Sequence, residues 1–394
     1  MKIITTNHFR LYPTKPQEEK LLWTLDQCRF TYNKLLEGLQ QQKLNRTELQ
    51  HSLLRLKEHH PHLSQVYSKT LQYENHRLFS NLRSLSQRKK QGKKAGKLRF
   101  KGKNWFNTFT YNQSGFTIIT RTPVHDLLHL SKIGDIPMVM HRDIQGTIKQ
   151  ITIKHHLSGK WYASVITEAE QNVPQKPVDK MIGIDLGLVH LATDSDGHSI
   201  DHPKHLKKSL DKLKKHQQRL SRKKKASHNR VKARKKVAKI HEHITHQRND
   251  FLHKLSRSYV DTYSLIAVED LSISYMIRHP YLSQSIADAS WSRFTQMLCY
   301  KAVRAGSRVV KVDPHGTSQI CSQCGGKVKK SLHERIHSCS CGLVMDRDYN
   351  AAINILKRAV GQELPQVTPV EIEPLPLQGH VRSMKQDAQA FRPE

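Results

Sequence analysis

The sequence has few acidic residues, few cysteines and no long apolar run. Its 394 residues hold 33 acidic side chains against 66 Lys and Arg, a net charge of +33. This excess excludes an ordinary metabolic enzyme as the first hypothesis and favours a polyanionic partner, of which nucleic acid is the commonest. With no run of 18 apolar residues and no signal peptide, we expect no membrane partner.

Six cysteines are too few for a disulfide scaffold in a chain of this length. Four of them cluster as Cys321-x-x-Cys324 and Cys339-x-Cys341, a pattern typical of thiolate ligands around a tetrahedral Zn²⁺. A zinc with four protein ligands would be structural. Free thiols also indicate a reducing compartment, so we expect a cytoplasmic, nucleoid-associated bacterial protein.

The second cysteine pair has one intervening residue where two are commoner. Two alternatives therefore stay open: His337 or His333 replaces one thiolate, or the cysteines are reduced and hold no metal. The other two cysteines, Cys28 and Cys299, lie on apolar helix faces and are interpreted as packing residues.

The first half of the chain changes from helical to β-rich periodicity. After a short strand and a Pro-Thr-Lys-Pro break, a helix is predicted from about residue 15, and more helix from 46 to 89. Short alternating runs separated by turns predict a β-rich barrel or sandwich over 105–170. The proline-bearing segment 173–180 indicates a domain boundary.

The second half predicts mixed α/β structure. Residues 181–200 predict a β-meander, and the apolar runs at 264–271 and 307–314 predict further strands. The tail 361–394 is proline-rich without periodicity and is predicted to be disordered. Helices are expected over 204–239 as a basic pair, on to about 263, and over 285–305 and 348–359.

Three acidic residues occupy distinctive places in the predicted elements. Asp185 is predicted to lie mid-strand among apolar neighbours and next to two glycines, Glu269 ends an apolar strand, and Asp348 begins a helix. Carboxylates placed in this way can converge on one point and hold Mg²⁺ or Mn²⁺, which support in-line displacement at phosphorus. Each acid also has a plainer interpretation as a turn or cap residue. Their joint occurrence, with the cysteine cluster before the last of them, favours a metal site.

Two segments are strongly basic. Residues 83–103 hold ten Lys and Arg and no acid, and 204–239 hold 17 against one acid. Charge runs are usually solvated helix faces, but an imbalance this large requires a polyanion to relieve its self-repulsion. The basic candidates for nucleic-acid contact are Lys97, Arg99, Lys101, Arg222, Lys223, Lys224 and Arg230.

These motifs together resemble one family. GIDLGL (183–188), IAVEDL (266–271) and DRDYNAAINIL (346–356) are similar to the three RuvC-type motifs of TnpB proteins, which are transposon-encoded, RNA-guided DNA endonucleases related to type V CRISPR effectors. The resemblance extends over roughly residues 8–360, through blocks such as SIADASWSRFTQMLCYKA and VKVDPHGTSQICSQCG.

The resemblance implies a multidomain α/β fold, in which an RNase H-like RuvC nuclease domain with a zinc-ribbon-type insertion follows an N-terminal lobe with a helical recognition part and a β-barrel (wedge) part. The implied divisions are the first wedge strand (1–12), the helical recognition domain (13–95), the wedge barrel (96–175), the RuvC-like domain with long basic helices (178–317), the zinc-binding insertion (318–345), the final RuvC helix (346–360) and the tail (361–394).

The resemblance also implies site residues and partners. Asp185, Glu269 and Asp348 match the catalytic acids, with Asp346 and Arg347 as supporting residues. A guide RNA from the transposon end would pair with target DNA beside a short target-adjacent motif, with one protein per RNA. Candidate contacts to that motif are Tyr73, His76, Arg77, Thr110 and Asn112, whose alternative role is in the barrel core.

The implied activity is metal-dependent hydrolysis of DNA phosphodiesters. Two alternatives remain: a strand-transfer transposase, and a nuclease-inactive RNA-guided repressor, against which the presence of all three acids argues.

Overall fold

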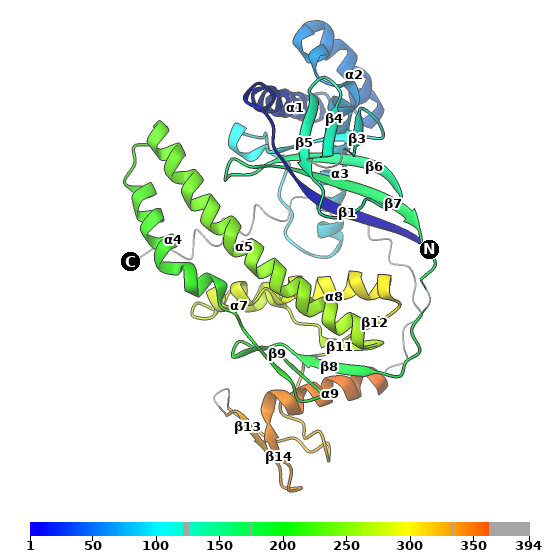
Figure 1. Cartoon of the computed structure of the whole chain (residues 1–394), viewed down its shortest axis with the longest axis vertical. Helices are drawn as coiled ribbons and strands as arrows, with labels where there is room; N and C mark the ends of the chain where they lie inside the picture. The colour runs from blue at the N-terminus through cyan, green and yellow to red at the C-terminus, as the bar shows by residue number, and fades with distance from the viewer. Residues whose placement is uncertain (121–125, 174, 332–333, 362–394) are drawn as a thin grey trace. The chain divides into compact units, whose positions relative to one another are not determined.

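The computed structural model describes residues 1–120, 126–173, 175–331 and 334–361, which form two compact units (Figure 1). Unit 1 spans Met1–Gln171 and unit 2 begins at Asn172, immediately before the predicted linker. The predicted disordered tail, Gly361 excepted, lies outside the described residues. Across the described ranges, no helix is both long and apolar enough to cross a membrane.

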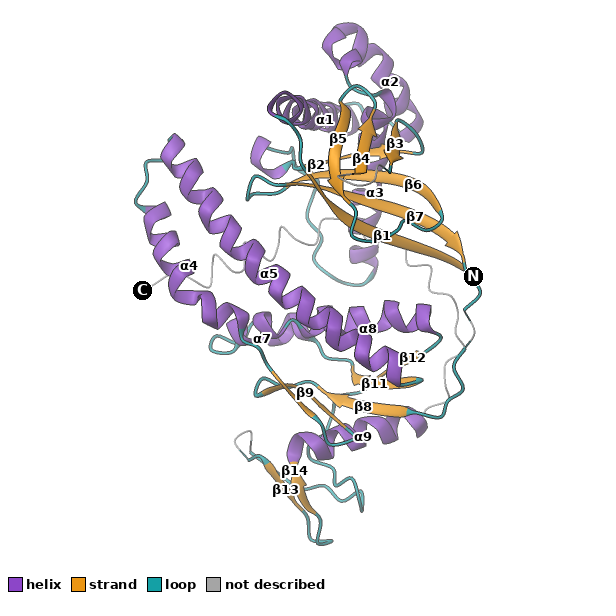
Figure 2. Ribbon diagram, in the orientation of Figure 1, coloured by secondary structure: helices purple, strands orange, loops and turns teal. Residues whose placement is uncertain are grey.

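Unit 1 contains a seven-stranded antiparallel, barrel-like sheet (Figure 2). Strand β1 lies in its middle and pairs along its whole length with β7, which is far away in sequence. The strands, in the order β2-β6-β7-β1-β5-β4-β3, are β1 (Lys2–Leu11), β2 (Thr108–Asn112), β3 (Phe116–Ile119), β4 (Asp126–Leu130), β5 (Gly134–Val139), β6 (Thr147–His155) and β7 (Trp161–Glu170).

The helices of unit 1 share one hydrophobic core with this sheet. The helical structure predicted over 46–89 is present as two helices, because the chain breaks between α2 and α3 at Pro61, which lacks the N–H that a helix interior requires. The helices are α1 (Lys15–Gln41), α2 (Arg46–His59), the short 3₁₀ helix η1 (Pro61–Gln65), α3 (Ser68–Lys90) and the 3₁₀ turn η2 (Lys103–Trp105).

A buried acid lies within unit 1. Glu74 of α3 is 0% exposed, and within the described part of the chain neither carboxylate oxygen accepts a hydrogen bond. Arg77 Nη1 lies 3.3 Å from Glu74 Oε2 and offsets the charge in part. Burial nevertheless raises the pKa of Glu74 from 4.5 to about 7.

Replacing this acid should change how unfolding depends on pH. Because the pKa of Glu74 is raised in the folded state, its ionisation costs stability progressively as pH rises from 4.5 to about 7. Glu74→Gln cannot ionise, so its stability relative to the unchanged protein should rise by roughly 3 kcal/mol over that interval. Urea unfolding followed by Trp fluorescence measures this, with the exposed Glu58→Gln as control. The prediction would be contradicted if the free energy of unfolding changed with pH in the same way in all three proteins.

Unit 2 is built on a five-stranded mixed sheet in the order β10-β9-β8-β11-β12. The predicted meander is confirmed as three antiparallel strands, and two further strands run parallel to the first. The strands are β8 (Met181–Asp185), β9 (His190–Asp194), β10 (Ser199–Asp201), β11 (Leu265–Glu269) and β12 (Arg308–Val312).

Helices cover both faces of this sheet. Helices α5, α7 and α8 pack with Ile184 and Val268 on one face, and α9 packs with Leu265 and Ala267 on the other. The helix predicted over 285–305 is divided at Ser290, whose φ is +55°. The helices are α4 (His205–Ser221), α5 (His228–Thr262), α6 (Ile273–Met276), α7 (Ser283–Ala289), α8 (Trp291–Ala305) and α9 (Arg347–Gly361).

The predicted pair of basic helices is confirmed as α4 and α5. They contact each other through a narrow apolar seam that includes Leu213 and Ile244, which leaves most lysines exposed. Asp288 of α7 anchors the hairpin, since it accepts hydrogen bonds from the Leu206 N–H and from Arg248 of α5.

Candidate active site

The parallel pairing of β8 with β11 brings Asp185 and Glu269 together. The prediction that Asp185 lies mid-strand is wrong, because β8 ends at this residue. Val268 of β11 lies beside Ile184 of β8. The residue after each of them is an acid, so Glu269 and Asp185 lie side by side at the ends of the two strands. Glu269 follows Leu265 and Ala267 in strand alternation and therefore shares their face, which is the face that α9 covers.

Helix α9 brings Asp348 to the same end of the sheet. Asp348, Ala352, Ile355 and Ala359 are buried at helical spacing, so the acid belongs to the face that packs on the strands. Close approach is possible because Gly183 has no side chain: a Cβ there would lie 2.2 Å from the Ala352 carbonyl oxygen. The glycine of GIDLGL thus sets the distance between α9 and β8.

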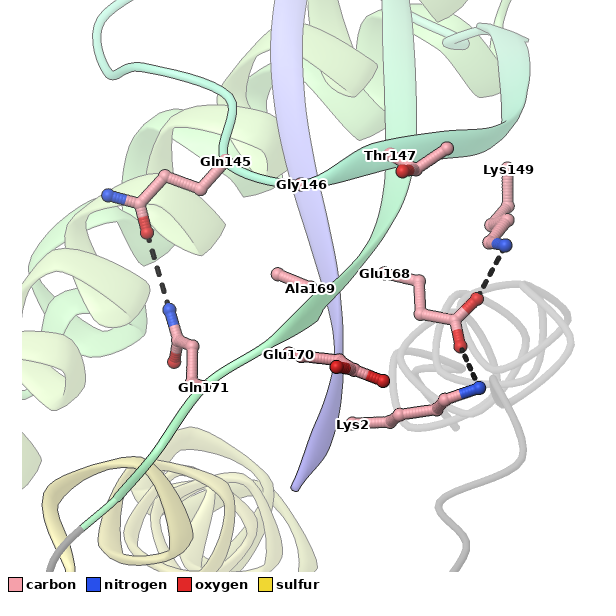
Figure 3. A pocket seen from close by; sticks show the side chains of 9 residues that line it. All are labelled: Lys2, Gln145, Gly146, Thr147, Lys149, Glu168, Ala169, Glu170 and Gln171. Atoms are coloured by element: carbon pink, nitrogen blue, oxygen red, sulfur yellow. Dashed lines mark hydrogen bonds and ion pairs between the residues drawn. The ribbon is translucent and has the colours of Figure 1, made fainter.

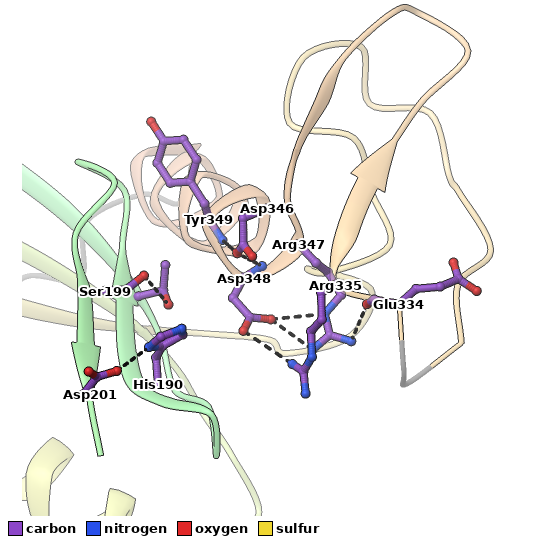
Figure 4. A network of polar contacts seen from close by, with 10 residues as sticks. His190, Ser199, Asp201, Glu334, Arg335, Asp346, Arg347, Asp348 and Tyr349 are labelled. Atoms are coloured by element: carbon purple, nitrogen blue, oxygen red, sulfur yellow. Dashed lines mark hydrogen bonds and ion pairs between the residues drawn. The ribbon is translucent and has the colours of Figure 1, made fainter. Parts of the chain in front are cut away.

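The two aspartates of DRDYN have different roles. Asp346 Oδ1 accepts hydrogen bonds from the backbone N–H of Asp348 at 2.8 Å and of Tyr349 at 3.0 Å, so it caps the N-terminus of α9. The supporting role expected for Asp346 is thus that of a helix cap. Asp348 Oδ1 instead accepts from Arg347 Nη2 at 3.0 Å, and Arg335 Nη1 lies 3.7 Å from Oδ2 (Figure 4).

The surroundings of Asp185 and Glu269 disfavour the ionised form of their carboxyl groups. Burial raises the pKa of Asp185 well above its ordinary value, and the neighbouring carboxylates of Glu269 and Asp348 add to the shift. Burial also raises the pKa of Glu269, while a 2.6 Å hydrogen bond from Thr317 Oγ1 opposes that shift. A site of this kind favours a bound cation.

The structure brings all four clustered cysteines together, including the short Cys339-x-Cys341 pair. The Sγ atoms of Cys321 and Cys341 lie 3.6 Å apart, as do those of Cys324 and Cys339. All four lie within 4.8 Å of one another, and among the described residues no other set of three or more His, Cys, Asp or Glu side chains is gathered closely enough to hold a metal ion. The three carboxylates are therefore less tightly gathered than the thiols.

The structure describes one of the two histidines that could have replaced a thiolate ligand. His337 is fully buried outside this group, with Nδ1 against Lys330 Nζ, and His333 lies outside the described residues. Backbone N–H groups lower the pKa of Cys321 to about 5, which favours the thiolate that a metal needs.

Two asparagines that sequence reasoning missed join this cluster to α9. Asn350 accepts a hydrogen bond from the Ser322 N–H and donates one to the Ile320 carbonyl oxygen, and Asn354 donates to the same oxygen. Both side chains are buried, at spacing i, i+4. Buried amides one helical turn apart require partners, and that is the signal that could have identified them. The hairpin of β13 (Ile336–Ser338) and β14 (Val344–Asp346) carries the second cysteine pair and leads directly into α9.

The candidates for contact with a target-adjacent motif gather in unit 1, around α3 and β2. Tyr73 and His76 stack with ring centroids 5.2 Å apart. Arg77 donates to the Thr108 carbonyl oxygen at 3.1 Å, and Thr110 is buried with its hydroxyl 2.9 Å from that of Thr152. Asn112 ends β2 half-buried. Arg77 and Thr110 thus have internal partners, and their role in nucleic-acid contact stays a prediction.

The basic candidates lie in two regions, where all but the half-buried Lys101 and Arg230 are exposed. Lys97, Arg99 and Lys101 belong to the segment between α3 and η2, where Asn33 binds the backbone of Lys101. In unit 2, Arg222, Lys223 and Lys224 follow α4 and are exposed. Arg230 donates to the carbonyl oxygens of Leu220 and Lys223 and so closes the α4–α5 turn.

An open polar pocket in unit 1 contains none of the predicted site residues (Figure 3). Among its lining residues, Glu168 pairs with Lys149 at 2.6 Å and with Lys2 at 3.6 Å. Gln171 donates to Gln145 at 3.3 Å. These groups satisfy one another, and we assign the pocket no function.

Three family descriptions match parts of the chain. Residues 164–279 match the OrfB_IS605 family, described as "Probable transposase", and residues 291–355 match the "Cas12f1-like, TNB domain". Residues 1–47 match a family described as "Helix-turn-helix domain". In the structure these residues form β1, α1 and the start of α2.

Known proteins match over most of the chain. A Streptomyces pristinaespiralis protein named "Putative RNA-guided DNA endonuclease" is 32% identical over 88% of this chain and 87% of its own length. Escherichia coli K12 has "Putative RNA-guided DNA endonuclease InsQ", 31% identical over 72% and 74%. A Cas12f1 chain, solved by cryo-EM with guide RNA and target DNA, matches with a TM-score of 0.59 at 14% identity over 90% of this chain and 98% of its own, which shows a shared fold.

Proposed function

Because the chain belongs to the TnpB family of transposon-encoded, RNA-guided DNA endonucleases, we propose that it hydrolyses DNA phosphodiesters with metal ions held by Asp185, Glu269 and Asp348. We take the five-stranded sheet of unit 2 with its helices to be the RuvC-like nuclease domain. The guide would come from the transposon end, and its pairing with target DNA beside a short motif would select the site.

One observation carries this proposal: three acids far apart in sequence meet at one end of a sheet. The register of β8 and β11 places Asp185 beside Glu269, and the contact of α9 with Gly183 brings Asp348 to them. Capping or turn formation explains each acid singly, but neither explains why all three meet.

The residues present fit a divalent ion such as Mg²⁺ or Mn²⁺. All three donors are carboxylates, the hard oxygen ligands that these ions prefer, and their mutual repulsion is relieved by a cation. Bound there, the ions supply an activated water and stabilise the leaving oxygen. Asp185 and Asp348 would hold the ions, Asp348 exchanging its arginine partners for them. Thr317 would orient Glu269, which completes the site.

The cysteine cluster fits a structural Zn²⁺. Zn–S bonds of about 2.3 Å in a tetrahedron place sulfur atoms roughly 3.8 Å apart. The 3.6 Å separations here are close to that value. With four protein ligands no position remains for a substrate, so we assign the zinc the task of fixing the start of α9 through the β13–β14 hairpin.

Removing one cysteine ligand should reduce DNA cleavage through loss of zinc, although the three acids are unchanged. Cys341→Ser should weaken zinc binding by more than about tenfold, the least that changes around a zinc site usually cause. DNA cleavage should fall with it, since α9 and Asp348 lose their anchor. Zinc content by atomic emission and cleavage of a guided target measure the two effects. Cys299→Ser, outside the cluster on α8, is the matched control. Full activity in a zinc-free Cys341→Ser protein would contradict the prediction.

Both units offer basic surfaces for the nucleic acids. The exposed lysines of the α4–α5 hairpin and of the segment after α3 neutralise phosphates without reading bases, as a protein guided by RNA requires. We propose the α3–β2 candidates as contacts to the target-adjacent motif, and a single protein per guide RNA.

Expressing the chain with its own genomic flank tests the proposal. A discrete RNA should copurify, and the complex should cut DNA that matches it. The "Probable transposase" description of the matching family keeps strand transfer as a second candidate. Nicked and linear products alone support hydrolysis, and joined strands support transposition. Absence of a discrete RNA would overturn the guided-nuclease proposal.

A further inference from the structure

A histidine and an aspartate without a role in the chemistry above lie beside the proposed nuclease site. Nδ1 of His190, the first residue of β9, is 2.8 Å from Oδ1 of Asp201, the last residue of β10. An ionised carboxylate only accepts hydrogen bonds, so Nδ1 carries a proton and Nε2 is left to face a substrate. The His190 side chain is 39% exposed, which leaves it accessible.

A β-bulge decides which face of the sheet His190 occupies. In a regular strand side chains alternate, so His190 would face away from Thr193. The pairing of β9 with β10 passes over Leu191, so that Asp201 lies opposite His190. Leu191 and Ala192 are then both buried in the core beneath α5 and α8. The bulge therefore turns His190 to the same face as Thr193.

That face carries the acids. Thr193 lies opposite Asp185 in the β8–β9 pair, and residues directly opposite share a face. A Cβ placed on Gly187 would lie 2.9 Å from the His190 carbonyl oxygen and 3.9 Å from Asp348 Oδ2, so the start of β9 adjoins the first turn of α9. Figure 4 shows the Asp348 carboxylate with arginines on one side and His190 on the other.

We propose that His190, positioned by Asp201 and carrying protons on both ring nitrogens before the cut, is a further catalytic residue that donates its Nε2 proton to the oxygen leaving phosphorus when DNA is cut. The inference rests on the proposed function and deepens it, because an alkoxide is a poor leaving group unless it is protonated or stabilised. Of the charged groups around His190, Asp201 from β10 contacts it, Asp185 from β8 shares its face of the sheet, and Asp348 of α9 adjoins the start of β9. Arg347 and Arg335 pair with Asp348 on the side away from His190.

The step needs no further reactant. The oxygen of a water molecule forms a bond to phosphorus, and the bond from phosphorus to the sugar oxygen breaks with its electron pair staying on that oxygen. The His190 Nε2 proton passes to it, the attacking water releases a proton to solvent, and solvent reprotonates His190. General acid catalysis of this kind accelerates reactions by about 10²–10⁴-fold.

A sulfur leaving group tests this role directly, because a thiolate leaves without being protonated. The substrate is a guided DNA target with sulfur in place of the bridging leaving oxygen at the mapped cut site. His190→Gln should cut ordinary DNA about 100-fold more slowly than the unchanged chain and the sulfur substrate at a nearly equal rate. Asp201→Asn should show a smaller loss, also rescued by sulfur. His129→Gln is the control, since His129 pairs in the same way with Asp135 at 2.6 Å in unit 1.

Two results would overturn the proposal. One is that His190→Gln cuts ordinary DNA at the full rate. The other is that His190→Gln cuts both substrates equally slowly although its unfolding temperature is the same as that of the unchanged chain. Should His190→Gln fail to fold, the rescue of Asp201→Asn decides the question in the same way. Absence of guided cutting by the unchanged chain would instead overturn the proposed function itself, and this step with it.

Discussion

Asp185→Ala should abolish DNA cleavage while guide RNA and target DNA remain bound. The loss should reach at least about a thousandfold, the scale seen when one group aimed at a transition state is removed. Asp185 ends β8 beside Glu269 of β11, and the carboxylates of both Glu269 and Asp348 raise its pKa, so its removal takes away the proposed ligand that interacts with both. Cleavage by the purified complex and DNA binding by gel shift measure the two properties separately.

The neighbouring acid Asp270 provides the control for this experiment. Asp270 follows Glu269 directly, but its exposed side chain pairs with Lys311 at 3.4 Å. Asp270→Ala should therefore cut at the unchanged rate. Asp185→Asn should also be inactive and, without divalent ions, more resistant to heat, because it removes a repelled charge. Undiminished cleavage by Asp185→Ala would sink the assignment of the site.

Gly183→Ala should damage both folding and activity. Its Cβ would lie 2.2 Å from the Ala352 carbonyl oxygen and 2.8 Å from the Leu356 nitrogen, backbone atoms of α9 that cannot rotate away. Overpacking of this kind typically costs about 1–3 kcal/mol. Because Asp348 lies on the same helix, a shift of about 1 Å would also cost roughly 100-fold in cleavage rate.

Thermal unfolding and guided cleavage measure the two effects of Gly183→Ala. Gly361→Ala, at the end of the same helix, is the matched control because its Cβ would meet no atom within 4 Å. Normal stability and normal cleavage in Gly183→Ala would mean that α9 does not lie this close to β8.

Patterns confined to a short stretch of sequence predicted most elements correctly. The apolar runs of β11 and β12 and the spacing of apolar residues in α9 were sufficient, since these elements bury whole faces. The helix predicted over 46–89 is present but divided in two at Pro61, a break that the sequence prediction did not include. The division of the helix over 285–305 has no such signal, because Ser290 adopts its left-handed conformation between two packed helices.

The sequence identified the candidate site residues by their type and order, but it did not determine the distances between them. Three acids in motif context and two cysteine pairs could be named from the sequence alone. Whether Cys339-x-Cys341 reaches the same point as Cys321-x-x-Cys324 could not, because that depends on how the β13–β14 hairpin closes. That Asp346 rather than Asp348 caps α9 likewise depended on backbone geometry.

Composition, periodicity and motifs thus determined by themselves the basic character of the protein, its α/β and β-rich halves, its family and its candidate acids. Only the tertiary structure decided that Asn350 and Asn354 join the cysteine cluster to α9, that arginines hold Asp348, and that a bulge turns His190 toward the acids. The physical reason is that the periodic pattern of apolar residues, which predicts a helix or strand, is contained within one short segment of the chain. Register, bulges and packing distances, by contrast, are set by partners far away in sequence.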